Sequence, residues 1–215
     1  GNLIKKNGAW LFRQSGTDGW HPANVPGCVH TDLLKLGQLP DPFVGDNERR
    51  VAWVAQKDWE YSRSFDVSPE TLLLENIWLV CDGLDTLATV SVNGAVLGKT
   101  NNMFRQYKWD VKPLLKQEGN DIRIDFASSV NFVSEKQTIR PLAGVPQAIP
   151  GGPLLRKAPC QFGWDWGPQL PPIGIWKDIR LEAFNNNRIA DVHLRQHHSD
   201  GNVRIEARVE IENAT

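Results

Sequence analysis

Long stretches of this sequence alternate between apolar and polar residues, and this period of two most constrains how the chain can fold. In the run 58–66, apolar Trp59, Tyr61 and Phe65 alternate with polar residues, and Arg63 is the exception on the apolar side. Successive side chains of a strand point to opposite faces, so the pattern is typical of a half-buried β-strand. Helical stripes are scarce, and we expect a chain built mainly from strands.

Turn signals divide these alternating runs. Asn93-Gly94 stands between two apolar segments, and both residues tolerate the positive φ of a tight turn, which predicts a β-hairpin over residues 89–97. Further strands are expected over residues 78–80, 104–111, 121–126 and 176–184. Strands this numerous, without interleaved helices, indicate an all-β protein with an antiparallel β-sandwich of jelly-roll type.

One short helix is expected beside these strands. It would begin with Thr31 as its N-cap, include Leu33 and Leu34, and stop at Gly37, which adopts the left-handed conformation easily. His30, just before the N-cap, is expected to be hydrogen-bonded as part of the cap.

Composition excludes several classes of partner. The net charge of -1 provides no basic surface for a nucleic acid, and no run of about 18 apolar residues predicts a membrane span. Cys28, Cys81 and Cys160 lie too far apart for a zinc or redox motif, so no metal and no cofactor are expected. The chain starts at Gly1 without Met, which is compatible with export after removal of a signal peptide and equally with cloning, so the compartment is not predicted.

The alternation fails between residues 128 and 172, where proline and glycine are frequent. Long irregular segments within a compact domain are usually functional or disordered. Asn185-Asn186-Asn187 reads as a junction, and two more strands are expected at 191–194 and 203–211. These two strands cannot form a core alone. They either pack on the preceding sandwich or begin another domain, and we place the boundary between residues 1–186 and 187–215.

The irregular segment contains the run Phe-Gly-Trp-Asp-Trp-Gly-Pro at 162–168. Indole faces stack on the C–H faces of a pyranose, and the carboxylate of Asp165 can accept hydrogen bonds from neighbouring hydroxyls, so Trp164, Asp165 and Trp166 suit a neutral sugar. The alternative is a structural loop, with the tryptophans packed under a sheet edge and Asp165 bonded to backbone N–H groups. The residue chemistry leaves both interpretations open.

Several motifs resemble those of β-mannosidases of glycoside hydrolase family two. The run Arg-Lys-Ala-Pro-Cys-Gln-Phe-Gly-Trp-Asp-Trp-Gly-Pro at 156–168, followed by Gly-Ile-Trp at 174–176, is similar to a run of that family. Four other regions continue the resemblance in order: Val-Pro-Gly-Cys-Val-His-Thr-Asp-Leu at 25–33, Asp-Pro-Phe at 41–43 with Asp-Trp-Glu-Tyr at 58–61, Cys-Asp-Gly-Leu-Asp-Thr at 81–86, and Asn-Asn-Met-Phe-Arg at 101–105. The resemblance extends over about residues 10–184.

This resemblance implies a jelly-roll, galactose-binding-like domain, followed from residue 187 by the first strands of an immunoglobulin-like domain. In such enzymes a (β/α)8 barrel carries the two catalytic glutamates. Retaining hydrolysis needs two carboxyl groups about 5 Å apart, and no acidic pair here suggests itself. We therefore expect no catalytic residues in this chain, and no activity from the chain alone.

The resemblance also implies a role at the active site of an exo-acting, retaining β-mannosidase. Asp165 would bind the terminal β-D-mannose, Trp164 and Trp166 would shape the wall, and Asn102 would lie beside the sugar, although Asn101-Asn102 is also an ordinary turn sequence. The expected partners are a β-mannoside or mannose-terminated oligosaccharide and the immunoglobulin-like and barrel domains. Alternatives are a domain of another family-two enzyme, a β-galactosidase or β-glucuronidase, or a free-standing carbohydrate-binding module.

Overall fold

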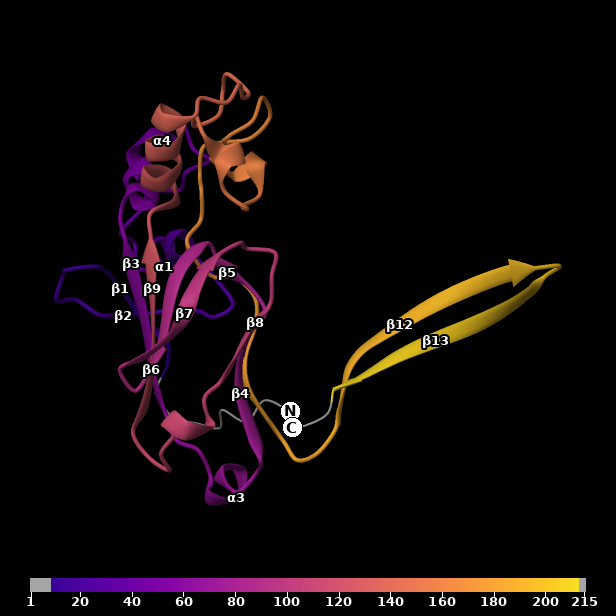
Figure 1. Ribbon diagram of the computed structural model, residues 1–215. Coiled ribbons are helices and arrows are strands. Elements are labelled where there is room, and N and C mark those ends of the chain that lie inside the picture. Colours follow the sequence, from indigo (N-terminus) through magenta and orange to yellow (C-terminus); the bar gives the residue numbers. More distant parts are fainter. Residues whose placement is uncertain (1–8, 213–215) are drawn as a thin grey trace.

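The computed structural model describes residues 9–212 and is built mainly from antiparallel strands (Figure 1). The strands are β1 (Leu11–Gln14), β2 (His21–Pro22), β3 (Trp59–Phe65), β4 (Asn76–Cys81), β5 (Leu84–Asp85), β6 (Leu87–Val92), β7 (Ala95–Asn101), β8 (Tyr107–Asp110), β9 (Asn120–Ala127), β10 (Gly174–Ile175), β11 (Ile179–Phe184), β12 (Arg188–Ser199) and β13 (Asn202–Glu212). The predicted all-β fold is confirmed.

Two sheets form the sandwich. One has six strands in the order β2-β1-β3-β9-β6-β7, and the other has three in the order β11-β4-β8. Buried side chains alternate along the strands, as in β9, where every second residue from Asn120 to Phe126 is buried. Phe12, Tyr61 and Phe126 of the larger sheet belong to one apolar core with Leu79 and Leu181 of the smaller sheet. The period of two in the sequence therefore produces the inner face of each sheet.

The hairpin predicted at Asn93-Gly94 is confirmed. Strands β6 and β7 pair up to Val92 and Ala95, and the two turn residues have φ values of 51° and 80°. The Asn93 side chain also donates to the carbonyl of Leu114 at 2.7 Å and accepts from the backbone N–H of Asp121 at 2.9 Å. Asn93 thus joins the turn to the segment that leads into β9.

The structure has more helices than the single one predicted. The helices are α1 (Val29–Lys35), α2 (Asn47–Val51), α3 (Pro69–Leu72) and α4 (Ser129–Ile139), with 3-10 turns η1 (Ala52–Gln56), η2 (Lys112–Leu114), η3 (Gly152–Leu154) and η4 (Pro159–Phe162).

The predicted start of α1 is wrong. Cys28 is the N-cap, and Thr31 lies within the first turn, where its hydroxyl donates to the Cys28 carbonyl at 2.8 Å. The end is as expected, because Gly37 has a φ of 70°. The helix begins earlier because the backbone N–H of Asp32 already donates to the Cys28 carbonyl at 3.2 Å. The Asp32 carboxylate accepts from the backbone N–H of Asn24 at 3.1 Å, which ties the first turn to the preceding loop.

Helix α4 opens the irregular segment that begins at residue 128. The Ser128 hydroxyl accepts from the N–H of Asn131 at 3.0 Å and donates to the carbonyl of Ala55 at 2.7 Å, so it caps the helix and holds it on η1. Figure 1 shows α4 and the coils that follow it gathered at one end of the sandwich. The chain returns through β10, which pairs with β5.

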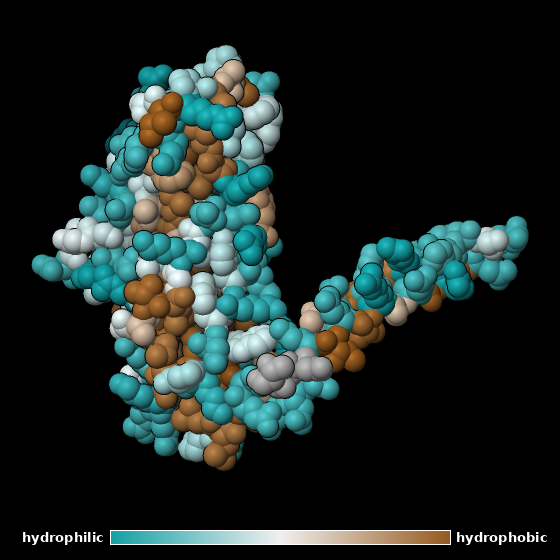
Figure 2. Space-filling view, in the orientation of Figure 1, coloured by the Kyte–Doolittle hydropathy of each residue, from teal (hydrophilic) through white to brown (hydrophobic). Residues whose placement is uncertain are grey.

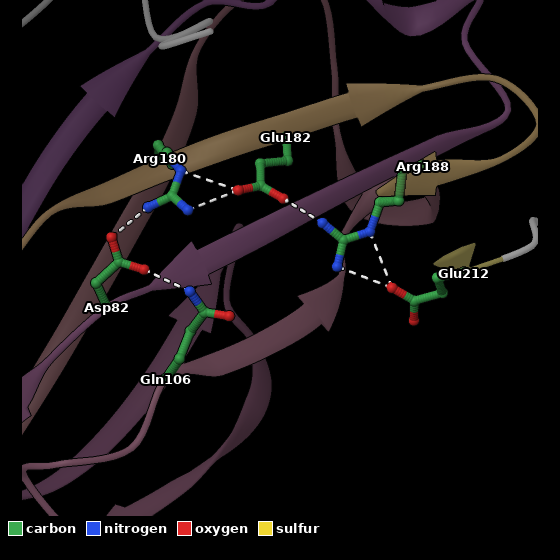
Figure 3. Close-up of polar contacts among 6 residues, drawn as sticks. All are labelled: Asp82, Gln106, Arg180, Glu182, Arg188 and Glu212. Atoms are coloured by element: carbon green, nitrogen blue, oxygen red, sulfur yellow. Dashed lines mark hydrogen bonds and ion pairs between the residues drawn. The ribbon is translucent and has the colours of Figure 1, made fainter. Parts of the chain in front are cut away.

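Strands β12 and β13 form a hairpin that projects from the sandwich (Figure 1). A chain of polar contacts joins its base to the smaller sheet (Figure 3). Arg188 donates to Glu212 at 2.9 Å and to Glu182 at 3.0 Å, Glu182 also binds Arg180, and Arg180 in turn contacts Asp82. Among the described residues, β12 and β13 pair only with each other and with no strand of the sandwich.

Candidate functional site

The Trp-Asp-Trp-Gly run forms a tight turn. The backbone N–H of Trp164 donates to the carbonyl of Gly167 at 2.9 Å, and the N–H of Gly167 donates back to the carbonyl of Trp164 at 3.3 Å. Asp165 and Trp166 occupy the tip between these two bonds. Trp166 is 74% exposed and Trp164 37% exposed. The indoles are therefore not packed under a sheet edge, as the structural alternative required.

Asp165 is exposed and makes no hydrogen bond or ion pair within residues 9–212. It does not serve the backbone donors that the structural alternative assigned to it. Its two oxygens are available as acceptors for a ligand, and one indole precedes it while another follows it. The three residues predicted together from the sequence thus lie together on one exposed turn.

The base of this turn is held from two sides. Gly163 has a φ of 106°, and a Cβ there would lie 2.9 Å from the Gln147 carbonyl oxygen. The Ile149 N–H donates to the Phe162 carbonyl at 2.8 Å, which joins the segment before the turn to the coil that follows α4. A glycine is required at 163 because any side chain would meet that coil.

Gln169 braces the other side, and nothing in the sequence indicated this role. Its side chain donates to the Gln147 carbonyl at 2.7 Å, and its backbone N–H donates to the carboxylate of Glu48 in α2 at 2.7 Å. Three segments far apart in the sequence therefore meet at one residue. The turn is exposed at its tip and fixed at its base, which is the arrangement of a pre-formed binding loop.

A buried ion pair anchors the segment that leads to the turn. The Lys157 ammonium lies 2.6 Å from Asp85 Oδ1 in β5 and 2.8 Å from the Pro172 carbonyl, and both charged side chains are almost completely buried. Burial lowers the pKa of Lys157, while the Asp85 carboxylate opposes this shift. The ion pair fixes the chain before the turn to β5, and the hydrogen bond to Pro172 joins it to the chain after the turn.

His30 lies close to this ion pair and is 8% exposed. Neither ring nitrogen has a hydrogen-bond partner among the described residues, so the prediction of a hydrogen-bonded capping histidine is wrong. Burial lowers its pKa to about 4, and the nearby Lys157 cation contributes to this shift. His30 is therefore a neutral residue near pH 7, packed at the start of α1.

An open cavity of about 710 Å³ lies beside the turn. Trp164 and Phe162 line it together with the coil after α4, which contributes Leu142, Val145 and Ile149. The sequence predicted an irregular segment here but no cavity, because the cavity is formed by packing between residues that are distant along the chain.

Comparison with known proteins assigns this architecture to a protein family. The family described as glycosyl hydrolase 2 galactose-binding domain-like matches residues 10–177. The chain belongs to this family. The domain is 42% identical over 193 residues to β-mannosidase A of Emericella nidulans and 35% identical over 190 residues to the β-mannosidase of Bos taurus. The predicted resemblance to the amino-terminal domain of family-two β-mannosidases is confirmed.

Solved structures agree with this assignment. The crystal structure of the β-D-mannosidase of Dictyoglomus thermophilum is similar with a TM-score of 0.88 and 36% identity, over 95% of this chain and 25% of that one. The exo-chitosanase of Amycolatopsis orientalis shares the fold, with a TM-score of 0.69 at 16% identity. The chain spans only about a fifth of the two curated relatives, 20% and 22% of their length.

Asn102 follows β7 directly and is not part of the exposed turn. Its side-chain oxygen accepts from the N–H of Phe104 at 2.9 Å, so it forms the ordinary turn that the sequence also allowed. Asn102 also bridges to Arg156, which precedes the buried Lys157. No hydrogen bond joins Asn102 to the three residues of the exposed turn in the described part of the chain.

No group of three or more His, Cys, Asp or Glu side chains within residues 9–212 is arranged to hold a metal ion. Among the same residues, no helix has the length and apolar character needed to cross a membrane.

Proposed function

We propose that this chain is the non-catalytic amino-terminal domain of an exo-acting, retaining β-mannosidase, and that its exposed turn contributes to the pocket for the terminal β-D-mannose. The observation that carries the proposal is the unpaired, exposed carboxylate of Asp165 between two exposed indoles on a braced turn. A carboxylate accepts bonds from two sugar hydroxyls, and indoles stack on sugar C–H faces.

Asp165 would act by orienting the sugar. Its hydrogen bonds would go to hydroxyls away from the anomeric carbon, because the two catalytic carboxyl groups must flank the scissile bond themselves. Trp164 and Trp166 would exclude water from one side of the pocket. The glutamates that perform the chemistry would lie in a barrel outside this chain, beyond the immunoglobulin-like domain that residues 187–215 would begin.

Substitution of Asp165 tests this role in the full-length natural protein. Losing a hydrogen bond to a charged group costs about 1.5–3 kcal/mol, so Asp165→Ala should lower kcat/KM for an aryl β-mannoside by about one to two decades. Asp18→Ala, which removes another exposed carboxylate, is the matched control and should change nothing. Unchanged hydrolysis in Asp165→Ala would refute the proposal.

Experiments on the 215-residue chain alone test whether catalysis and full sugar binding need other parts of the protein. We expect it to release no mannose, because the catalytic carboxylates would lie elsewhere, and to bind mannose and mannobiose only weakly, because it would supply only part of the pocket. Calorimetric titration of both sugars gives the answer. Strong binding by the bare chain would instead indicate a free-standing carbohydrate-binding module.

We also propose that residues 187–215 begin an immunoglobulin-like domain, with the jelly-roll domain ending near residue 186. The support is the hairpin β12–β13, whose apolar residues lie on one face and remain exposed, as the brown atoms along it show (Figure 2). Two strands alone are marginally stable in water. Further strands of the same domain would cover that face.

A further inference from the structure

The cavity beside Trp164 has an apolar wall. Of its lining residues, only Gln137 and Trp164 have a polar side-chain atom, and both ends of the Gln137 amide are occupied. Gln137 Nε2 donates to the Leu142 carbonyl at 2.9 Å, and Gln137 Oε1 accepts from the Leu142 N–H at 3.1 Å. Apart from the indole N–H of Trp164, the lining therefore offers no unpaired polar side-chain atom to a ligand. An apolar group fits such a wall better than a hydroxylated sugar does.

Part of the wall is tightly packed. A Cβ on Gly151 would lie 2.5 Å from the Val133 carbonyl oxygen, and one on Gly152 would lie 2.9 Å from the Phe162 ring, so the coil is packed directly on α4 and η4. The hydrogen bond from the Ile149 N–H to the Phe162 carbonyl also connects this coil to η4. A volume of about 710 Å³ is in the usual range for a pre-formed small-molecule site.

The position of the cavity limits what could occupy it. Trp164 belongs both to the cavity wall and to the exposed turn, and the next residue is Asp165. A ligand that reaches both places needs a hydroxylated part for the carboxylate and an apolar part for the cavity. A glycoside with an apolar substituent on its anomeric oxygen has these two parts.

We propose that this cavity binds the apolar aglycone, an alkyl or aryl group, of a β-mannoside whose sugar contacts Asp165. The inference rests on the function proposed above, and it adds a second determinant of substrate choice on the same loop. Each buried methylene gains about 0.8 kcal/mol. A hexyl group that enters the cavity should therefore favour its mannoside over the methyl mannoside by about tenfold or more.

Nuclear magnetic resonance on the 215-residue chain tests the cavity directly. Hexyl β-mannoside and hexan-1-ol should shift the methyl resonances of Leu142 and Val145, whereas methyl β-mannoside at the same concentration should not. Hexan-1-ol separates binding of the alkyl group from binding of the sugar. If neither hexyl compound shifts these resonances, the proposal is overturned.

Kinetics in the full-length natural protein test the role of the cavity in substrate choice. The readout is the ratio of kcat/KM for hexyl over methyl β-mannoside. Ala148→Phe, which fills the cavity, should lower this ratio about fivefold or more, and Val145→Thr should lower it by a smaller factor because it changes polarity at constant shape. Val96→Thr makes the same exchange on exposed β7 and should leave the ratio unchanged.

The outcomes separate the two proposals. If neither cavity variant alters the ratio, the proposal of an aglycone site is overturned. The same result is expected if other parts of a longer chain fill the cavity, and it overturns the proposal in that case too. Asp165→Ala should slow both mannosides by the same factor and leave the ratio as it was. If Asp165→Ala has no effect while the cavity variants do alter the ratio, the role of Asp165 fails, and the cavity is an aglycone site without the contact to Asp165.

Discussion

Lys157 introduces a positive charge into the interior, and Asp85 is its counter-charge. Removing one member of a buried pair leaves the other buried and uncompensated, which costs about 3–5 kcal/mol. We expect Lys157→Met to lower the free energy of unfolding by this amount in urea titrations. Lys99→Met, at an exposed position on β7, is the control. A loss below about 1 kcal/mol would mean that the pair contributes little to holding the turn.

His30 makes stability depend on pH. Its pKa is about 4 in the folded chain against 6.5 without the fold, so between these values the unfolded chain binds a proton that the folded chain does not. Stability therefore falls as the pH decreases from about 6.5 to 4, by on the order of 2–3 kcal/mol. Below pH 4 this contribution changes no further.

The measurement compares unfolding free energies at pH 7.5 and pH 4.5. Carboxyl groups also titrate in this range, so the informative quantity is the difference between wild type and His30→Leu, which should show the weaker dependence. His198→Gln, at an exposed histidine, should behave as wild type. Identical pH profiles for wild type and His30→Leu would contradict the assignment.

At the scale of elements, the exposed turn depends on Gly163. Its φ of 106° and its contact with the Gln147 carbonyl leave no room for a side chain, so Gly163→Ala should cost about 1–3 kcal/mol and displace the turn. Hydrogen exchange of the Ile149 N–H, which is bonded to Phe162, should accelerate. Gly144→Ala lies in the same coil with open space around it and should leave that exchange rate unchanged.

Elements were predictable where a local signal determined them. The period of two around Tyr61 and the Asn93-Gly94 turn identified β3 and the β6–β7 hairpin, because both depend on neighbouring residues. Helix α4 was missed, since most of its surface is exposed and it has no apolar stripe. Its position depends on Ser128, whose hydroxyl donates to the carbonyl of Ala55 in η1, 73 residues earlier in the sequence, and no short-range pattern encodes that contact.

At the scale of the whole molecule, the hairpin β12–β13 leaves apolar side chains uncovered. Leu194 and Ile205 lie on one face and are 59% and 62% exposed. Exposed apolar faces and unpaired strand edges favour association. We expect the 215-residue chain to self-associate, with a sedimentation coefficient that increases with concentration.

The double variant Leu194→Thr with Ile205→Thr should weaken this association. The matched control is Leu73→Thr with Val96→Thr, which removes two exposed apolar side chains from the sandwich instead. If the chain remains monomeric at all concentrations, or if the hairpin variant and the control variant self-associate equally, the hairpin face is not the surface through which the chain associates. That result would weaken the argument that further strands normally cover it.

The sequence by itself determined the strand content, the β6–β7 hairpin, the family and the three residues of the exposed turn, because each depends on a local pattern or a contiguous motif. Only the tertiary structure decided that Asp165 makes no hydrogen bond or ion pair within residues 9–212, that Lys157 is paired with Asp85, that Gln169 braces the turn, and that a cavity lies beside Trp164. The physical reason is that contacts and cavities are formed by residues far apart in the sequence, and their positions are set by the packing of the two sheets.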